Sequence, residues 1–156
     1  MKIEYVKGDL FETNIKTIVH GCNAQGVMGS GVAKIIHEKY PKAYNRYRSE
    51  YERQGNLVLG DIIAVPVGDR INDFDNYRVI INAITQDFYG RDGSRFVSYD
   101  AVAECMAKID RMYSVYGISE VAMPKIGAGL GGGDWNVIES IIESELKNVK
   151  AVVYEL

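Results

Sequence analysis

The chain is organised around the stretch Asn23-Ala24-Gln25-Gly26-Val27-Met28-Gly29-Ser30-Gly31-Val32-Ala33, where an apolar strand is expected to end and a helix to begin. Its three glycines fall within six positions, which we call the first glycine loop (Gly26–Gly31). Glycine lets a ligand approach the backbone without a Cβ in the way, and a helix start offers unpaired N–H groups and the positive end of a dipole. The stretch therefore predicts a site for a negatively charged group, most naturally a phosphate.

A second glycine-rich segment also lies between an expected strand and an expected helix, and we call it the second glycine loop (Gly127–Gly133). The two loops together suggest a diphosphate held between them. The alternative is that each loop is only a tight turn. The glycine spacing is not that of the dinucleotide fingerprint, and the chain contains no GxxxxGK[ST] motif, so neither the usual NAD domain nor a P-loop is indicated.

The composition fits one domain, residues 1–156, with a net charge of −3 that disfavours nucleic acid as the main partner. Cys22 and Cys105 give neither a disulfide framework nor the spacing of a zinc site, so no metal is expected and a reducing cytoplasm fits best. The sequence shows no apolar leader and no apolar run of membrane-spanning length. We therefore expect a soluble, cytoplasmic monomer with no membrane contact.

The pattern of apolar residues alternates between strand and helix periods along the chain. Strands are expected at Met1–Val6, Thr17–Cys22, Leu57–Val67 (broken at Pro66), Tyr77–Ile84, Glu120–Ile126 and Val149–Glu155, and helices at Ser30–Tyr40, Pro41–Gln54, Ser98–Tyr116 and Trp135–Leu146. Such alternation predicts an α/β fold with a largely parallel or mixed sheet and helices on both faces. Ligands in such folds bind beyond the carboxyl ends of the strands, where both glycine loops and the irregular stretch Thr85–Phe96 are expected.

Five runs of residues, spread over nearly the whole chain, carry a family resemblance. They are Val6-Lys7-Gly8-Asp9, His20-Gly21-Cys22-Asn23, Gly29-Ser30-Gly31-Val32-Ala33, Pro124-Lys125-Ile126-Gly127-Ala128-Gly129-Leu130-Gly131-Gly132-Gly133-Asp134-Trp135 and Val152-Val153-Tyr154-Glu155-Leu156. In this order they resemble the macro domain family, which binds ADP-ribose. The chain is more similar to the branch with terminal ADP-ribose protein glycohydrolase, the DNA ADP-ribose hydrolases of toxin–antitoxin systems and the yeast-type ADP-ribose 1″-phosphate phosphatase. The resemblance implies a three-layer α/β/α fold with a mixed, largely parallel six-stranded sheet.

The resemblance also implies the adenine end of a ligand site. Asp9 would accept a hydrogen bond from the adenine amino group, Leu10 would line the adenine pocket, and Tyr154 would stack on the ring. The alternatives are a turn-forming aspartate after Gly8 and a tyrosine that only packs at the end of a strand.

The remaining implied ligand contacts lie in and beside the glycine loops. Backbone N–H groups would bind the diphosphate, and they belong to Gly29, Ser30, Gly31, Val32, Ile126, Gly127, Ala128, Gly129, Leu130 and Gly131. Asn23 would reach the distal ribose, or it could simply end its strand with an Asx turn.

The catalytic pattern of the glycohydrolases is not retained. Gln86 stands where these relatives use a lysine to attack the anomeric carbon, and Gly131 stands where an acidic partner is found. An uncharged amide cannot form the Schiff base that this mechanism needs. His20 resembles the histidine of the yeast-type phosphatase, and it could protonate a leaving ribosyl oxygen, orient water or position a terminal phosphate. The alternative is a strand histidine whose hydrogen bonds are satisfied inside the core.

Two carboxylates are secondary catalytic candidates. Asp87, with Asp92 in the same stretch, could activate water beside the distal ribose, whereas Asp134 matches the Gly-Gly-x-Asp-Trp run but is also placed to cap a helix. We expect ADP-ribose as the ligand and no cofactor. Three functions stay open: a phosphatase on ADP-ribose 1″-phosphate, a non-catalytic ADP-ribose reader or sponge, and a hydrolase that removes ADP-ribose from protein or nucleic acid by substrate-assisted attack of water.

Overall fold

The structure is a computed structural model that describes residues 2–70, 77–89, 96–129 and 131–156. Its strands are β1 (Glu4–Lys7), β2 (Thr17–Asn23), β3 (Ile62–Arg70), β4 (Tyr77–Gln86), β5 (Glu120–Met123) and β6 (Lys150–Glu155). Its helices are α1 (Gly31–Lys39), α2 (Pro41–Gln54), α3 (Tyr99–Tyr116), α4 (Trp135–Glu145) and a short 3₁₀ turn, η1 (Leu10–Glu12). Leu130 and Asp92, and part of the irregular stretch expected at Thr85–Phe96, lie outside the described residues.

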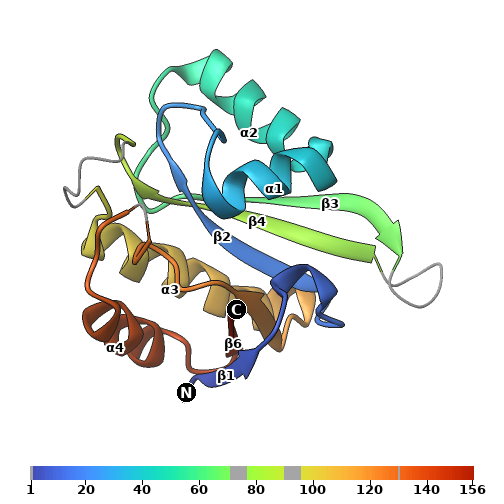
Figure 1. Ribbon diagram of the computed structural model, residues 1–156, viewed down its shortest axis with the longest axis vertical. Coiled ribbons are helices and arrows are strands. Elements are labelled where there is room, and N and C mark those ends of the chain that lie inside the picture. The colour runs from blue at the N-terminus through green and yellow to red at the C-terminus, as the bar shows by residue number, and fades with distance from the viewer. Residues whose placement is uncertain (1, 71–76, 90–95, 130) are drawn as a thin grey trace.

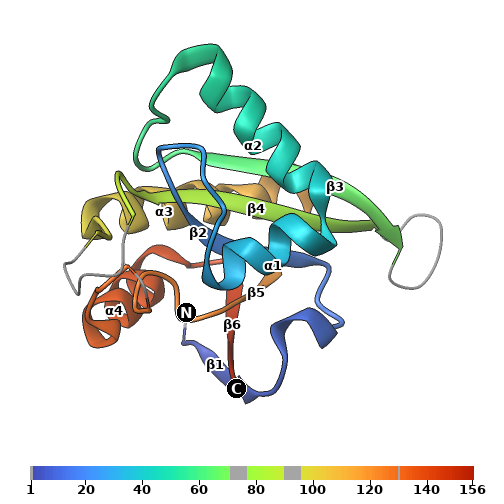
Figure 2. The same cartoon turned by 45° about the horizontal axis from the view of Figure 1, so that its top comes forward.

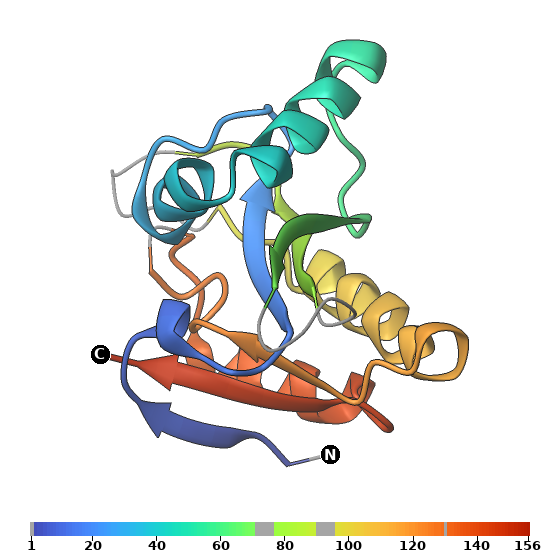
Figure 3. The same cartoon turned by 90° about the vertical axis from the view of Figure 1, so that its right-hand side faces the viewer.

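The strands form one six-stranded sheet in the order β1-β6-β5-β2-β4-β3. Every neighbouring pair is parallel except β3 and β4, which are antiparallel. Helices α1 and α2 cover one face of the sheet and α3 and α4 cover the other (Figure 1). Figures 2 and 3 show the same division from two further sides. The three-layer α/β/α fold with a mixed, largely parallel sheet is therefore confirmed.

Two buried clusters join the sheet to its helix layers. The α1/α2 core includes Ile18, Ile36, Tyr47, Ile80 and Ile84, and the α3/α4 core includes Val19, Ile81, Met106, Ile138 and Ile142. Neighbouring residues of β2 fall in opposite clusters because successive side chains of a strand point to opposite faces. β2 is covered on both faces, which fits its largely apolar and partly β-branched sequence.

Several strand boundaries differ from the sequence expectation for identifiable reasons. β5 ends at Met123 because Pro124 follows and has no N–H to donate. Pro66 does not break β3, which is an edge strand where a missing donor is tolerated, although the register with β4 shifts after it. β4 continues to Gln86, two residues beyond the expected end, because it stays paired with β2 through Asn23.

The expected helices agree closely with the observed ones. Pro41 opens α2 at a first-turn position, and Ser98 caps α3 by accepting a hydrogen bond from the N–H of Ala101. Gly117 ends α3 in the left-handed conformation with φ of 72°. Within the described part of the chain, no helix combines the length and apolarity needed to cross a membrane.

Candidate functional site: a cleft between two glycine loops

The cleft opens where β2 and β5 separate. Within the described residues these two parallel strands pair only at Ile18 and Ala122, whereas β2 stays paired with β4 along its full length. Beyond the single pairing, the ends of β2 and β5 lead into the two glycine loops, and a cavity of about 670 Å³ lies between them. This is the carboxyl edge of the parallel strands, where the sequence predicted a site.

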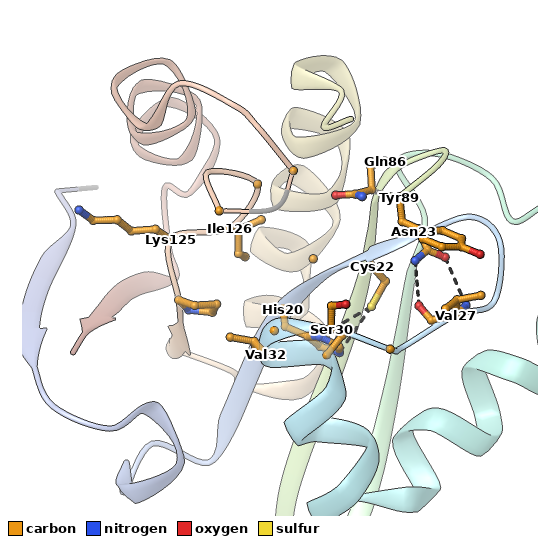
Figure 4. Close-up of a pocket in the computed structure, with 18 residues that line it drawn as sticks. His20, Cys22, Asn23, Val27, Ser30, Val32, Gln86, Tyr89, Lys125 and Ile126 are labelled. Carbon is orange, nitrogen blue, oxygen red and sulfur yellow. Dashed lines mark hydrogen bonds between the residues drawn. The ribbon is translucent and has the colours of Figure 1, made fainter. Parts of the chain in front are cut away.

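The cleft lining contains ten of the predicted site residues. They are His20, Asn23, Gly29, Ser30, Gly31, Val32, Ile126, Gly127, Gly129 and Gly131. Figure 4 shows the labelled side chains around the cleft, with Gln86 and Tyr89 at one end and Lys125 at the other. Segments from β2, α1 and the end of β5 are thus brought together although they are far apart in the sequence.

The N-terminus of α1 faces the cleft. Ser30, Gly31, Val32 and Ala33 all line it, and the side chain of Ser30 does not cap the helix. The first N–H groups of a helix have no partner inside the helix, and they lie at the positive end of its dipole. This end of the cleft therefore suits an anion that accepts several backbone hydrogen bonds.

The second glycine loop folds tightly against the α3/α4 core. The N–H of Gly133 donates to the carbonyl of Gly127 at 2.8 Å. Gly127 has a φ of 77°, and a Cβ at this position would lie 2.7 Å from Cγ2 of Val97. Only glycine fits such a position without displacing its neighbours, so the loop backbone packs directly on the core while Gly127 also lines the cleft.

The side chain of Asn23 fixes the turn that leads into the first glycine loop. Its Oδ1 accepts hydrogen bonds from the N–H groups of Gln25 at 3.0 Å and Val27 at 3.3 Å, and its Nδ2 donates to the carbonyl of Val27 at 2.8 Å. The Asx-turn alternative is therefore present in the structure. Asn23 still lines the cleft, so contact with a distal ribose stays a prediction.

His20 is a buried histidine rather than an exposed acid. Its side chain is 1% exposed, and Nε2 lies 2.6 Å from Oδ1 of Asn82, whose Nδ2 donates to the carbonyl of Ala43. This arrangement assigns the ring proton to Nε2. Burial lowers the pKa of the imidazole from 6.5 to about 4, so the ring is neutral at pH 7. The satisfied core histidine that the sequence left open is the arrangement found, and the geometry argues against direct proton transfer from His20.

Gln86 and Gly131 face each other at the far end of the cleft. The Nε2 of Gln86 donates to the carbonyl of Phe88 at 2.7 Å, which turns Oε1 toward the second glycine loop. A Cβ at Gly131 would lie 2.7 Å from the carbonyl oxygen of Gly127 and 3.1 Å from Oε1 of Gln86. The backbone here has no room for an acidic side chain at Gly131, so both departures from the glycohydrolase pattern belong to one packing arrangement.

The two secondary carboxylates are engaged elsewhere. Oδ1 of Asp87 accepts a hydrogen bond from Nε2 of Gln25 at 2.9 Å. Asp134 caps α4 by accepting from the N–H of Asn136 at 2.9 Å, as its place before a helix suggested. Neither lines the cleft, so the structure does not bring them to the predicted catalytic position.

The predicted adenine residues lie just outside the cleft lining. Asp9 caps η1 through a 2.9 Å hydrogen bond from the N–H of Phe11, and Leu10 is buried in the α1/α2 core. The hydroxyl of Tyr154 lies 2.7 Å from Oγ1 of Thr13. These contacts match the turn and packing alternatives, and adenine recognition by these residues stays a prediction. Ala128 also lies outside the lining.

Besides Gln86, seven further residues that line the cleft were not among the predicted site residues. They are Gly21, Cys22, Val27, Ala33, Tyr89, Pro124 and Lys125. Lys125 forms an ion pair with Glu155 at 2.6 Å and points away from the cleft in Figure 4. Burial raises the pKa of the Cys22 thiol well above its usual range, so Cys22 is not a ready nucleophile. Among the described residues, no three His, Cys, Asp or Glu side chains gather as metal ligands would.

A family model described as Macro domain matches residues 19–142. The chain belongs to the macro domain family. A solved structure described as the macrodomain of Mycobacterium tuberculosis DarG superposes on this macro domain with a TM-score of 0.82 and 28% identity, covering 99% of this chain and 97% of that one. The resemblance inferred from the five sequence runs is thus confirmed.

Two relatives of this macro domain carry the names of different activities. It is 31% identical over 155 residues to the DNA ADP-ribosyl glycohydrolase of Mycobacterium tuberculosis (strain ATCC 25618 / H37Rv), a match that covers 97% of this chain but 42% of the relative. It is 29% identical over 152 residues to an ADP-ribose 1''-phosphate phosphatase of Lodderomyces elongisporus, a match that covers 92% of each. The chain therefore spans less than half of the mycobacterial protein and nearly all of the yeast one.

Proposed function

We propose that this macro domain binds ADP-ribose in the cleft between its glycine loops and removes the terminal phosphate of ADP-ribose 1″-phosphate. The observation that carries the proposal is the uncapped N-terminus of α1, which faces the second glycine loop across a cavity of about 670 Å³. A diphosphate placed there would receive backbone hydrogen bonds from both loops. The near full-length match to a protein named as the phosphatase supports this choice of reaction.

In the proposed reaction, water attacks the phosphorus atom and the bond from phosphorus to the ribosyl oxygen breaks. The proton that the attacking water loses ends on the ribosyl oxygen, and inorganic phosphate is released. His20 does not supply that proton in our scheme, because its Nε2 is directed at Asn82 behind the cleft. We assign His20 to holding β2 in place. Gln86, which ends β4 in the cleft lining, lies at the end where the distal ribose would be.

A non-catalytic ADP-ribose reader is the second candidate. The observation that favours it is the state of the candidate catalytic groups. The ring of His20 is buried and neutral, Lys125 is paired with Glu155, and Asp87, outside the cleft lining, is bonded to Gln25. A binder needs none of these groups to be free. In either case we propose a cytoplasmic monomer without metal or cofactor, for which nucleic acid matters only as an ADP-ribosylated substrate.

The test combines phosphate release from ADP-ribose 1″-phosphate with calorimetric titration by ADP-ribose, for wild type and His20→Gln. Phosphate release by both proteins, with ADP-ribose binding, supports the phosphatase and the supporting role of His20. Tight binding without release supports the reader. Release of ADP-ribose from modified protein or DNA, in place of phosphate, would establish the de-ADP-ribosylating hydrolase instead. A wild-type protein that does not bind ADP-ribose would refute the proposal as a whole.

A further inference from the structure

The face of the first glycine loop that lies away from the cleft is held by α2. No residue of α2 is among the described residues that line the cleft. One turn of this helix nevertheless contacts this segment through three side chains. Tyr47 contacts Asn23, which precedes the loop, and Arg48 and Tyr51 contact Gly26 at its start. This helix therefore supports the ligand site without touching a ligand.

The contact runs through Asn23, which sets the conformation of the loop. Asn23 accepts hydrogen bonds from the N–H groups of Gln25 and Val27 and donates one to the carbonyl of Val27, and these bonds close the turn that leads into the loop. Figure 4 shows the two bonds between Asn23 and Val27 as dashed lines. Val27 itself lines the cleft, so the position of Asn23 decides where part of the cleft wall lies.

The hydroxyl of Tyr47 holds Asn23 from behind. It lies 2.6 Å from the carbonyl oxygen of Asn23 and 2.8 Å from its Oδ1, and it donates to them. The side chain of Tyr47 is fully buried in the α1/α2 core, where water cannot replace the hydroxyl as donor. Burial also raises the pKa of the Tyr47 phenol, so the hydroxyl keeps its proton at neutral pH.

Two further contacts hold the next part of the loop. Nη1 of Arg48 donates to the carbonyl of Gly26 at 3.2 Å. The ring of Tyr51 packs so closely on Gly26 that a Cβ there would lie 2.7 Å from its Cγ. Gly26 has a φ of 76°, so the loop turns sharply at the point where it rests on the helix.

We propose that Tyr47 is a positioning residue for the cleft, and that through Asn23 its hydroxyl fixes the first glycine loop in the conformation that receives the ligand. The hydroxyl contributes nothing that helix α2 or the packing of the ring requires, since phenylalanine would fill the same volume. Its hydrogen bonds go to the one residue that organises the loop.

The test is Tyr47→Phe, with Tyr44→Phe on the same helix as the matched control. Tyr44 stacks on His37 and does not contact the loop through a described hydrogen bond. We expect Tyr47→Phe to weaken ADP-ribose binding about fivefold to tenfold. Because two buried oxygens of Asn23 lose their donor, the midpoint of thermal unfolding should also fall by roughly 2–10 °C relative to the control. Amide hydrogen exchange without ligand should quicken more at Gln25 and Val27 than in α3.

The two readouts separate this inference from the proposed function on which the affinity assay rests. Faster exchange at Gln25 and Val27 supports the positioning role even if wild type proves not to bind ADP-ribose. Unchanged exchange, or unchanged affinity in a wild type that does bind, overturns it. If Tyr47→Phe does not fold, Asn23→Ala removes the side chain through which the hydroxyl is proposed to act. Unchanged exchange at Gln25 and Val27 in that variant also overturns the inference.

Discussion

Acidification should destabilise this protein through His20, and the size of the effect follows from the burial of its ring. The pKa of His20 is lowered from 6.5 to about 4 by burial, against the opposing effect of the hydrogen bond to Asn82. Between these two values the unfolded chain binds a proton that the folded chain does not, so stability falls as pH falls. Linkage gives a loss of about 2 kcal/mol between pH 7 and pH 5, and about 3 kcal/mol once pH is below 4.

Urea unfolding of wild type and His20→Gln at several pH values between 7 and 5 measures this effect. Glutamine keeps an amide donor for Oδ1 of Asn82 and does not titrate. Other groups titrate equally in both proteins, so the difference between the two stability curves isolates His20. We expect the wild type to lose about 2 kcal/mol more than the variant over this range. Parallel curves would refute the burial of a neutral ring and would reopen a role for His20 as an acid in the cleft.

Three further predictions concern the loops and the segment beside the adenine site. Gly131→Ala places a Cβ 2.7 Å from the carbonyl oxygen of Gly127. It should lower the free energy of unfolding by about 1–3 kcal/mol, whereas Gly129→Ala, whose Cβ meets nothing within 4 Å, should leave it unchanged. Equal free energies of unfolding in urea would contradict this prediction. Arg78→Met leaves two backbone carbonyls without their buried guanidinium donor and should cost about 2–4 kcal/mol, against less than about 0.5 kcal/mol for an exposed arginine elsewhere. Asp9→Ser keeps a capping oxygen and removes the carboxylate, so ADP-ribose affinity should fall about tenfold in calorimetry; unchanged affinity would remove Asp9 from the adenine site.

The helices and central strands could be predicted from sequence because local signals and tertiary packing agree there. Pro41 opens α2 and Gly117 ends α3 at the positions expected from their backbone preferences. Strand β2 is apolar on both faces and lies in the middle of the sheet. The order of the strands could not be predicted, because it depends on long-range pairing such as that of β1 with β6.

The site was predicted in outline, but the state of its side chains was not. The glycine loops are visible as sequence, since glycine is needed wherever a backbone turns or approaches closely. Whether His20 faces a ligand or the core depends on Asn82, 62 residues away. It also depends on α2, because the carbonyl of Ala43 accepts a hydrogen bond from Nδ2 of Asn82. The role of Tyr47 was equally hidden, because a tyrosine at a core position of a helix indicates only packing until its hydroxyl is located.

The single pairing between β2 and β5 has a consequence for the cohesion of the whole molecule. Within the described residues, the sheet consists of a β3-β4-β2 half and a β5-β6-β1 half that pair only at Ile18 and Ala122. Each half carries one glycine loop beside the boundary between β2 and β5. A diphosphate bound by both loops would connect the two halves of the sheet. Ligand binding would therefore raise the free energy needed to separate the halves. The weakest junction of the sheet among the described residues and the proposed ligand site are thus the same part of the molecule.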